Sequence, residues 1–342
     1  MHILIIKLGA QGDVVRTTSL IPGLKKLYPL MQLTWVTAKN ALPLVSHLPD
    51  IKNVYAIDDF HPTLYEHTLF DWVISLDDEQ EACALASRLK YKKLSGAYEE
   101  TGKRVYTPDL EAWFGMGVLR PQENGGLQFA NQLKKQNQHS FGEILYECLG
   151  LSMPVARPQI TIGHLPHMVN TDPNRLVIGL NTSAGTRWKY KSWGEEQTVQ
   201  LAKRLHDELY ANVLILGGPQ ETKRNQRIVA KAARPYVLET PSNLNLLSFA
   251  ALIAKCDLLV SSDSLAMHFG IALEKPVIVF FGPTSSAEID LFGLGEKVVT
   301  PLPCHCCYLK NCSVRYHCME SIPVERLLNA AARWLPAIRK AA

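Results

Sequence analysis

The sequence predicts an α/β protein made of two doubly wound, Rossmann-like halves, each with a mostly parallel sheet covered by helices on both faces. Short apolar segments of strand character alternate with longer helical segments along the chain. The alternation stops at residues 163–173, a Pro- and His-rich stretch typical of a linker, and then restarts. A chain of 342 residues is also long enough for two domains.

These observations set the expected domain boundaries. We expect an N-terminal domain at residues 1–165 and a C-terminal domain at 173–322, which includes a Cys-rich segment at 304–318. A final helix at 323–342 would pack back on the N-terminal domain.

The first half has the clearest pattern near its start. Its apolar segments predict strands at residues 2–8, 33–37, 54–57 and 71–76. Helices are expected at residues 14–28, 79–89, 110–116 and 141–149. The remainder of residues 96–140 is polar and is expected to be irregular.

The second half repeats this alternation. Strands are expected at residues 176–181, 212–216, 258–261 and 276–281. Helices are expected at residues 195–209, 220–232, 246–256, 264–273 and 324–339. Ligands of doubly wound sheets bind beyond the carboxyl ends of the strands, so the loops that follow these strands should carry the functional residues. In two domains, these ends can face each other across a central cleft.

Composition and charge narrow the class of protein. The chain is 47% hydrophobic and 20% charged, which is typical of a globular protein, and a net charge of +4 does not argue for nucleic-acid binding. The N-terminus has neither a basic leader nor a small-residue cleavage site, and no apolar run reaches the ~18 residues of a membrane span. We therefore expect a cytoplasmic protein.

The loop after the first strand, residues 9–13 (GAQGD), offers a candidate catalytic carboxylate. It is not the G-x-G-x-x-G of dinucleotide-binding proteins and has no acidic residue at the ribose spacing. Asp13 is placed where a carboxylate could act as a general base. The alternative is an Asp at a helix start, favoured there by the helix dipole.

Two loops of the second half suit a nucleotide. Residues 181–193 (NTSAGTRWKYKSW) combine small hydroxylated residues with basic ones, as a phosphate-bearing ligand requires, although a basic surface loop is the alternative. Residues 217–221 (GGPQE) allow close approach of a ligand, and Glu221 could accept hydrogen bonds from ribose hydroxyls. A tight turn with Glu in the first helical turn is the alternative.

A third loop is the most informative. Residues 261–268 (SSDSLAMH) end a strand and begin a helix at once, so the amides of Ser264, Leu265 and Ala266 would form an anion site suited to a diphosphate. His268 lies one turn into this helix, where a buried structural histidine is the alternative. Residues 282–284 (GPT) close the next strand with another turn of small residues. The layout is that of a two-domain sugar-nucleotide enzyme of the GT-B type.

Five segments of the chain resemble one known family, the ADP-heptose–lipopolysaccharide heptosyltransferases of glycosyltransferase family 9. The resemblance runs from Ile3 to about Leu328. The segments are ILIIKLGAQGDVVRTT, FDWVISLD, GTRWKYKSW, LILGGPQE and DSLAMHFGIALEKPVIVFFGPT. It implies a GT-B fold and an inverting, metal-independent transfer of heptose from ADP-heptose to the inner core of lipopolysaccharide.

The resemblance also implies roles for individual residues. Asp13 would be the catalytic base, with Gly12 and Arg16 beside it as contacts of the acceptor. Lys191 would neutralise the diphosphate leaving group in catalysis. The donor-binding set implied is Thr182, Ser183, Arg187, Lys191, Glu221, Asp263, Ser264, Leu265, Ala266 and His268.

A cysteine cluster stands apart from these loops. The spacing Cys304-x2-Cys307-x4-Cys312-x5-Cys318 suits four thiolates around a tetrahedral Zn or a single Fe. Three further groups are possible substitutes: His305, Cys306 and His317. A disulfide or free thiols are the alternatives, and a reducing cytoplasm disfavours the disulfide. Since glycosyl transfer needs no such ion, the metal would be structural, and no cofactor is required for catalysis.

The expected partners follow from the resemblance. An ADP-heptose donor and an anionic glycolipid acceptor would bring the enzyme to the cytoplasmic face of the inner membrane as a peripheral protein. The basic side chains that suit such a surface are Arg88, Lys90, Lys92, Lys93, Lys103 and Arg104, for which a solvated basic face is the alternative. Three other functions stay open: transfer from another nucleotide sugar, sugar-nucleotide epimerisation, and non-catalytic binding of a sugar nucleotide or glycan.

Overall fold

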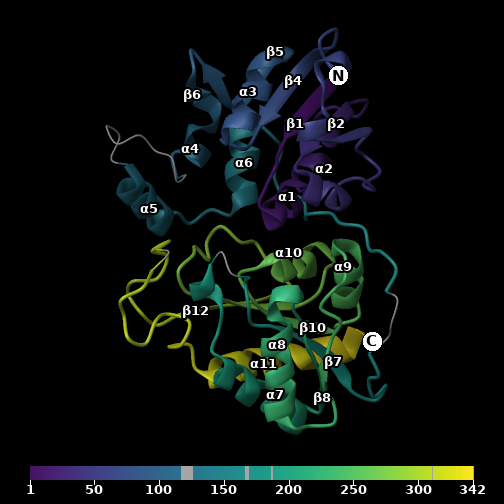
Figure 1. Cartoon of the computed structure of the whole chain (residues 1–342), viewed down its shortest axis with the longest axis vertical. Coiled ribbons are helices and arrows are strands. Elements are labelled where there is room, and N and C mark those ends of the chain that lie inside the picture. The colour runs from purple at the N-terminus through teal and green to yellow at the C-terminus, as the bar shows by residue number, and fades with distance from the viewer. Residues whose placement is uncertain (117–125, 166–168, 186–187, 310, 342) are drawn as a thin grey trace. The chain divides into compact units, whose positions relative to one another are not determined.

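The computed structural model describes residues 1–116, 126–165, 169–185, 188–309 and 311–341. The chain divides into two compact units, unit 1 at Met1–Thr161 and unit 2 at Ile162–Ala342. Each unit is a six-stranded sheet with helices packed on it (Figure 1). The predicted linker begins inside unit 2, where the amide of Gly163 donates to the carbonyl of Leu247 at 2.9 Å.

The sheet of unit 1 has the strand order β3-β2-β1-β4-β5-β6. Its strands are β1 (His2–Ile6), β2 (Gln32–Thr37), β3 (Asn53–Ala56), β4 (Leu69–Ser75), β5 (Lys90–Glu100) and β6 (Lys103–Tyr106). Neighbouring strands from β3 to β5 run parallel, and β6 runs antiparallel to β5. The winding direction reverses between β1 and β4, which makes the loops after these two strands the topological switch point of unit 1.

The helices of unit 1 differ from the predicted ones at two places, the first helix and α5. They are α1 (Gln11–Thr17), α2 (Leu20–Leu27), α3 (Gln80–Arg88), α4 (Glu111–Phe114), α5 (Gly126–Gln136) and α6 (Phe141–Leu149). The single helix predicted at 14–28 is wrong, because it is two helices separated at Thr18 and Ser19. Pro22 has no N–H with which to continue the ladder to Thr18, and the hydroxyls of Thr18 and Ser19 bond back to carbonyls of α1.

The prediction of an irregular region at 96–140 is also wrong in part. β5, β6 and α5 were missed there. Neither strand shows a regular alternation of apolar and polar residues, because β6 is the edge strand, β5 lies next to it, and many of their side chains are exposed and polar.

The sheet of unit 2 has the order β12-β11-β10-β7-β8-β9, and its neighbouring strands run parallel. Its strands are β7 (Leu176–Asn181), β8 (Ala211–Ile215), β9 (Val237–Glu239), β10 (Leu258–Ser262), β11 (Val277–Phe281) and β12 (Gly295–Val299). The two edge strands β9 and β12 were not predicted, because they are short and partly polar. The switch point of unit 2 lies between β7 and β10.

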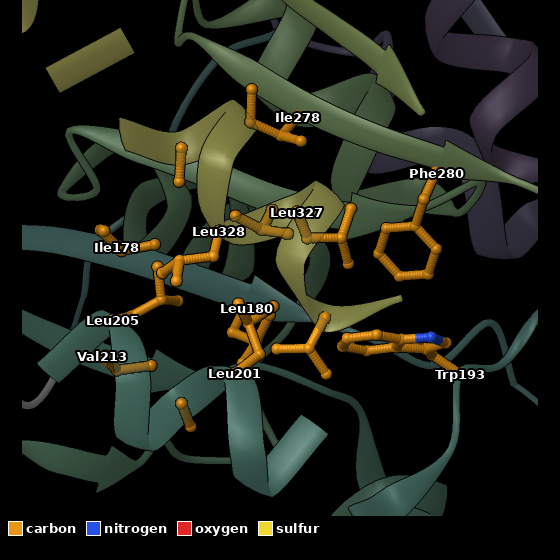
Figure 2. Packing of buried hydrophobic residues seen from close by; sticks show 14 of the residues in the cluster. Ile178, Leu180, Trp193, Leu201, Leu205, Val213, Ile278, Phe280, Leu327 and Leu328 are labelled. Atoms are coloured by element: carbon orange, nitrogen blue, oxygen red, sulfur yellow. The ribbon is translucent and has the colours of Figure 1, made fainter. Parts of the chain in front are cut away.

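Helices cover both faces of this sheet (Figure 1). They are α7 (Glu195–Leu209), α8 (Thr222–Ala232), α9 (Leu246–Ala254), α10 (Leu265–Ala272) and α11 (Val324–Ala341). Leu201 of α7 and Leu327 of α11 meet the strand residue Leu180 in one buried cluster (Figure 2). The rings of Trp193 and Phe280 close the cluster at 5.6 Å between centroids.

The last helix contributes to the core of unit 2. The described side chains of α11, up to Leu335, bury their apolar face there, against α7 and the sheet. The expected packing of the segment 323–342 on the N-terminal domain stays a prediction. Among the helices that the structure describes, none combines the length and apolar composition that a membrane span requires.

Candidate active site

The polar residues at the switch point of unit 2 are joined by hydrogen bonds across neighbouring strands. Asn181, at the end of β7, donates from its side-chain amide to Ser183 O at 3.0 Å and to Ser264 Oγ at 2.9 Å. Ser262, at the end of β10, donates to Ser183 O at 3.0 Å. The 182–193 loop and the turn that begins α10 are therefore held together at one edge of the sheet.

An ion pair bridges the same two loops. Lys191 Nζ donates to Asp263 Oδ2 at 2.7 Å, and Thr284 Oγ1, at the end of β11, donates to the same oxygen at 2.7 Å. Both charged side chains are mostly buried, at 17% and 15% exposed. Burial alone would raise the pKa of Asp263, but the charge and hydrogen bond of Lys191 outweigh it and lower this pKa to about 2. Asp263 is therefore a fixed carboxylate at neutral pH.

The start of α10 lies directly beside this pair. Ser264 is the N-cap residue, and Leu265 and Ala266 form the first turn, whose amides have no partner within the helix by geometry. His268 is buried on the same helix, and its amide donates to Ser264 O at 3.4 Å. An electrostatic interaction with His268 also lowers the pKa of Asp263. The amides and Lys191 together suit an anion.

The end of β8 adds a carboxylate. Glu221 Oε2 accepts from the amide of Gly218 at 3.0 Å, and its Oε1 accepts from Ser183 Oγ at 3.3 Å. Gly217 must be glycine here, since a Cβ would lie 2.6 Å from Asn225 Nδ2 and 2.8 Å from Glu221 Cβ. Ser183 and Glu221, two residues of the predicted donor set, are thus in contact, whereas Arg187 lies outside the described residues.

Sequence reasoning missed a half-buried arginine that holds the 182–193 loop. Arg224 of α8 donates through Nη2 to Thr182 Oγ1 at 2.9 Å, to Trp193 O at 3.0 Å and to Thr198 Oγ1 at 3.2 Å. It therefore contacts both ends of the loop. Burial lowers the pKa of Arg224. The sequence signal was slight, a basic residue on the otherwise ordinary polar face of a helix.

Thr284 was also missed as a functional residue. Residues 282–284 stood out in the sequence as a turn of small residues, without a role for the hydroxyl. The bond from Thr284 to Asp263 depends on β10 and β11 being neighbours, which no local pattern reveals.

In unit 1, Asp13 lies in the first turn of α1, directly after β1. Its Oδ1 is 2.9 Å from Arg16 Nε, and the Asp13 side chain is 35% exposed. The guanidinium of Arg16 also lies over the ring of Phe141, at 4.0 Å from the centroid. Asp13 thus has both the accessibility that a base needs and the position that the helix dipole favours, so both interpretations fit this geometry. Gly12 precedes it in the same turn.

The metal prediction finds no support. Among the described residues, which include Cys304, Cys307, Cys312 and Cys318, no group of three or more His, Cys, Asp or Glu side chains gathers as a metal site would require. Cys306 and Cys318 are buried, and Cys304 is exposed. Burial, followed by the nearby thiols, raises the pKa of Cys318 to about 11.

Comparison with known proteins shows which family the chain is similar to. The sequence model of glycosyltransferase family 9 (heptosyltransferase) matches residues 135–316, more than half of the chain. The chain is similar to lipopolysaccharide heptosyltransferase 2 of Escherichia coli (strain K12), with 25% identity over 311 residues that cover 83% of this chain and 84% of that protein.

Two solved structures are similar in fold. The glycosyl transferase family 9 protein from Veillonella parvula DSM 2008 has a TM-score of 0.75 at 18% identity, covering 98% of this chain and 97% of the other. E. coli ADP-heptose LPS heptosyltransferase II has a TM-score of 0.69 at 19% identity, covering 100% of both. The predicted GT-B class is confirmed. Because the family match spans more than half of the chain, the protein belongs to glycosyltransferase family 9, the heptosyltransferases, and is a glycosyltransferase.

Proposed function

We propose that this enzyme transfers heptose from ADP-heptose to the inner core of lipopolysaccharide, with inversion at the anomeric carbon and Asp13 as the general base. The observation that carries the proposal is the Lys191–Asp263 pair, which lies at the switch point of unit 2 beside the start of α10. A sugar nucleotide needs this combination of a cation, oriented amides and a fixed carboxylate.

On the donor side, the diphosphate would bind the amides of Ser264, Leu265 and Ala266. Lys191 has three N–H donors, so it can keep its bond to Asp263 and still donate to a phosphate oxygen. As the bond to the leaving group breaks, negative charge grows on the diphosphate, and donors already fixed in place stabilise it without reorganising. Asp263 would accept hydrogen bonds from sugar hydroxyls, with His268 beside it.

The nucleoside end would be held by the 182–193 loop and Glu221. Glu221 is already fixed by the amide of Gly218, so its second oxygen is directed toward Ser183 and the loop. A ribose hydroxyl pair would replace or share that contact. Thr182, Ser183 and Arg187 would line the same region.

On the acceptor side, Asp13 would take the proton of the attacking hydroxyl. The hydroxyl oxygen forms a bond to the anomeric carbon, the bond from that carbon to the β-phosphate oxygen breaks, and its electron pair leaves with ADP. Attack opposite to the leaving group inverts the configuration. Gly12 and Arg16 would contact the acceptor, with Arg16 also orienting the Asp13 carboxylate. Every group in this scheme is an amino-acid side chain or a backbone amide.

The identity of both substrates is inferred from two similar E. coli proteins, lipopolysaccharide heptosyltransferase 2 and ADP-heptose LPS heptosyltransferase II. A glycolipid acceptor also leads us to infer peripheral contact with the cytoplasmic face of the inner membrane. Three of the six basic side chains that suit this contact are paired with carboxylates, so they add little net charge to such a surface. Sedimentation with anionic and neutral vesicles tests the contact, which is refuted if binding to both is equally weak.

The test of function is a transfer assay with purified enzyme, ADP-heptose and lipopolysaccharide that lacks heptose. We expect product with wild type and a loss of about 10²- to 10⁴-fold with Asp13→Asn, the usual contribution of a general base. Asp50→Asn is a control in the same unit, because Asp50 pairs with the exposed Lys25. Full activity of Asp13→Asn would refute the mechanism.

Two further measurements address the alternatives. A thermal-shift comparison of ADP, UDP and GDP identifies the donor nucleotide, because a ligand that binds the folded state raises its apparent stability. Stabilisation by UDP or GDP in place of ADP would assign another donor. Binding of ADP-heptose without transfer to any core acceptor would instead support a non-catalytic binding protein.

A further inference from the structure

A buried ion pair in unit 1 lies outside the proposed chemistry but next to it. Lys7 follows β1, and Asp77 follows β4, so the pair spans the switch point of unit 1 as Lys191 and Asp263 span that of unit 2. The side chains of Lys7 and Asp77 are 6% and 7% exposed. Their ion pair is too enclosed to serve as a surface contact.

The carboxylate of Asp77 binds backbone as well as Lys7. Its Oδ2 accepts from the amide of Leu8 and, at 3.2 Å, from the amide of Gly9, while its Oδ1 accepts from Lys7 Nζ. Lys7 Nζ in turn donates to Gly9 O at 2.5 Å. Two successive amides and one carbonyl of the loop are therefore fixed by a single pair of side chains.

This loop leads directly into the helix that carries Asp13. Gly9 is followed by Ala10, whose carbonyl accepts from the amide of Val14 at 3.0 Å and so begins α1. Asp13 lies in that first turn. A change in the backbone at Gly9 would therefore move the Asp13 carboxylate, because only a short segment of backbone, which begins α1, connects the two residues.

A contribution to the stability of the fold does not explain this buried ion pair. Burial raises the pKa of Asp77 despite the opposing charge of Lys7, which reflects the cost of removing the carboxylate from water. Buried ion pairs are often no more stabilising than apolar residues of similar size. What an apolar pair could not supply is the set of directed bonds to Leu8 and Gly9.

We propose that Asp77, together with Lys7, is a positioning residue that holds the Gly9–Asp13 loop in the geometry in which Asp13 removes the proton from the acceptor. The inference rests on the proposed role of Asp13. A displacement of about 1 Å in a catalytic group lowers a rate by up to about 10²-fold.

The test compares Asp77→Asn with Asp71→Asn. Asp71 joins the same two strands at their other ends, accepting from the amide of His2 at 2.7 Å and from Lys92 at 2.6 Å. In the transfer assay we expect Asp77→Asn to lower kcat by about 10²-fold with little change in KM for ADP-heptose. Asp71→Asn should leave both parameters near wild type.

A double-variant comparison separates positioning from general structural damage. If Asp77 acts through Asp13, Asp77→Asn should cause little further loss of the residual activity of Asp13→Asn, because the group that it positions is gone. A purely structural role would lower kcat by the same factor in both backgrounds. That equal loss would overturn the proposal.

If Asp77→Asn does not fold, the deciding variant is the double substitution Lys7→Met and Asp77→Leu. It removes both charges, so no unpaired charge stays buried. The expected pattern is the same: a folded protein with normal ADP binding, a low kcat and little further effect when Asp13→Asn is added. If this double variant keeps the wild-type kcat and Asp13→Asn is inactive, the positioning role is overturned. Full activity of Asp13→Asn would instead refute the proposed function itself, so the two failures are distinguishable.

Discussion

The ammonium of Lys191 lies 2.7 Å from Oδ2 of Asp263, and this bond joins two loops that are 72 residues apart in the sequence. The loops follow β7 and β10, which are neighbours in the sheet and mark its switch point. The pair brings a cation and a fixed carboxylate to the place where doubly wound sheets bind ligands. The predictions below follow from this arrangement and the bonds around it.

Replacing Lys191 should affect the chemical step. We expect Lys191→Met to lower kcat by about 10²- to 10³-fold, since it removes a fixed donor to the leaving group. Lys189→Met is the matched control, because Lys189 lies two residues away and its ammonium lies over the ring of Tyr190. Steady-state kinetics with ADP-heptose compares them, and equal kcat values for the two variants would contradict the role of Lys191.

Asp263 should make stability depend on pH in the acid range. Its pKa is lowered to about 2 in the folded protein, against 3.8 for the ordinary side chain. The stabilisation is therefore fully present above about pH 4 and is lost as the pH falls toward 2. In urea unfolding, the difference in free energy of unfolding between wild type and Asp263→Asn should shrink from pH 5 to pH 3. A difference that stays constant over this range would rule the pKa shift out.

Thr284 should act on donor binding through Asp263. Thr284→Val keeps the shape of the side chain and removes the bond to Asp263 Oδ2. A hydrogen bond to a charged group contributes about 1.5–3 kcal/mol, so we expect KM for ADP-heptose to rise about tenfold or more. Thr300→Val is the control, because the hydroxyl of Thr300 bonds to Ser321, away from Asp263. If KM rises by the same factor in Thr300→Val, the effect of Thr284→Val does not depend on its bond to Asp263.

Arg224 should determine the order of the 182–193 loop. Arg224→Met loses three hydrogen bonds to the two ends of the loop and to α7, so we expect weaker ADP binding by calorimetry and a lower melting temperature. Arg224→Lys should restore little, because an ammonium lacks the planar geometry of the guanidinium.

The control for Arg224 lies on the same helix. Arg227 is exposed and pairs with Glu195, so Arg227→Met removes a charge from α8 without touching the loop. ADP affinity should then stay near wild type. If Arg224→Met also binds ADP normally, the loop does not depend on this arginine.

The sequence predicted the central strands well because they are buried. β1, β7 and β10 carry nearly continuous apolar runs, since helices cover both faces of a parallel sheet. The edge strands β9 and β12 were not predicted, because a short strand with polar residues resembles a loop. The split between α1 and α2 was also missed, although Pro22 gave a local signal for it.

The site shows the same division. Asp263, Ser264, Lys191 and Glu221 could be proposed from the sequence, because polar and glycine-rich turns at strand ends are local patterns that indicate ligand binding. Their roles stay predictions until the variants are measured. The cysteine spacing suggested a metal site in the same local way, but spacing does not show whether side chains are arranged to hold an ion, and among the described residues no group of three or more is.

By itself, the sequence determined that this is a two-domain α/β protein with strand-end loops suited to a sugar nucleotide. Apolar runs that indicate burial and the residues that favour turns are local patterns, so a single sequence shows them. Only the tertiary structure decided which side chains fix those loops. Arg224 reaches Thr182, Thr284 reaches Asp263, and Asp77 reaches Leu8 and Gly9 across strands that are neighbours in space but distant in the chain. Hydrogen bonds and ion pairs form over about 3 Å, so they depend on the register and order of the strands, which a single sequence does not display.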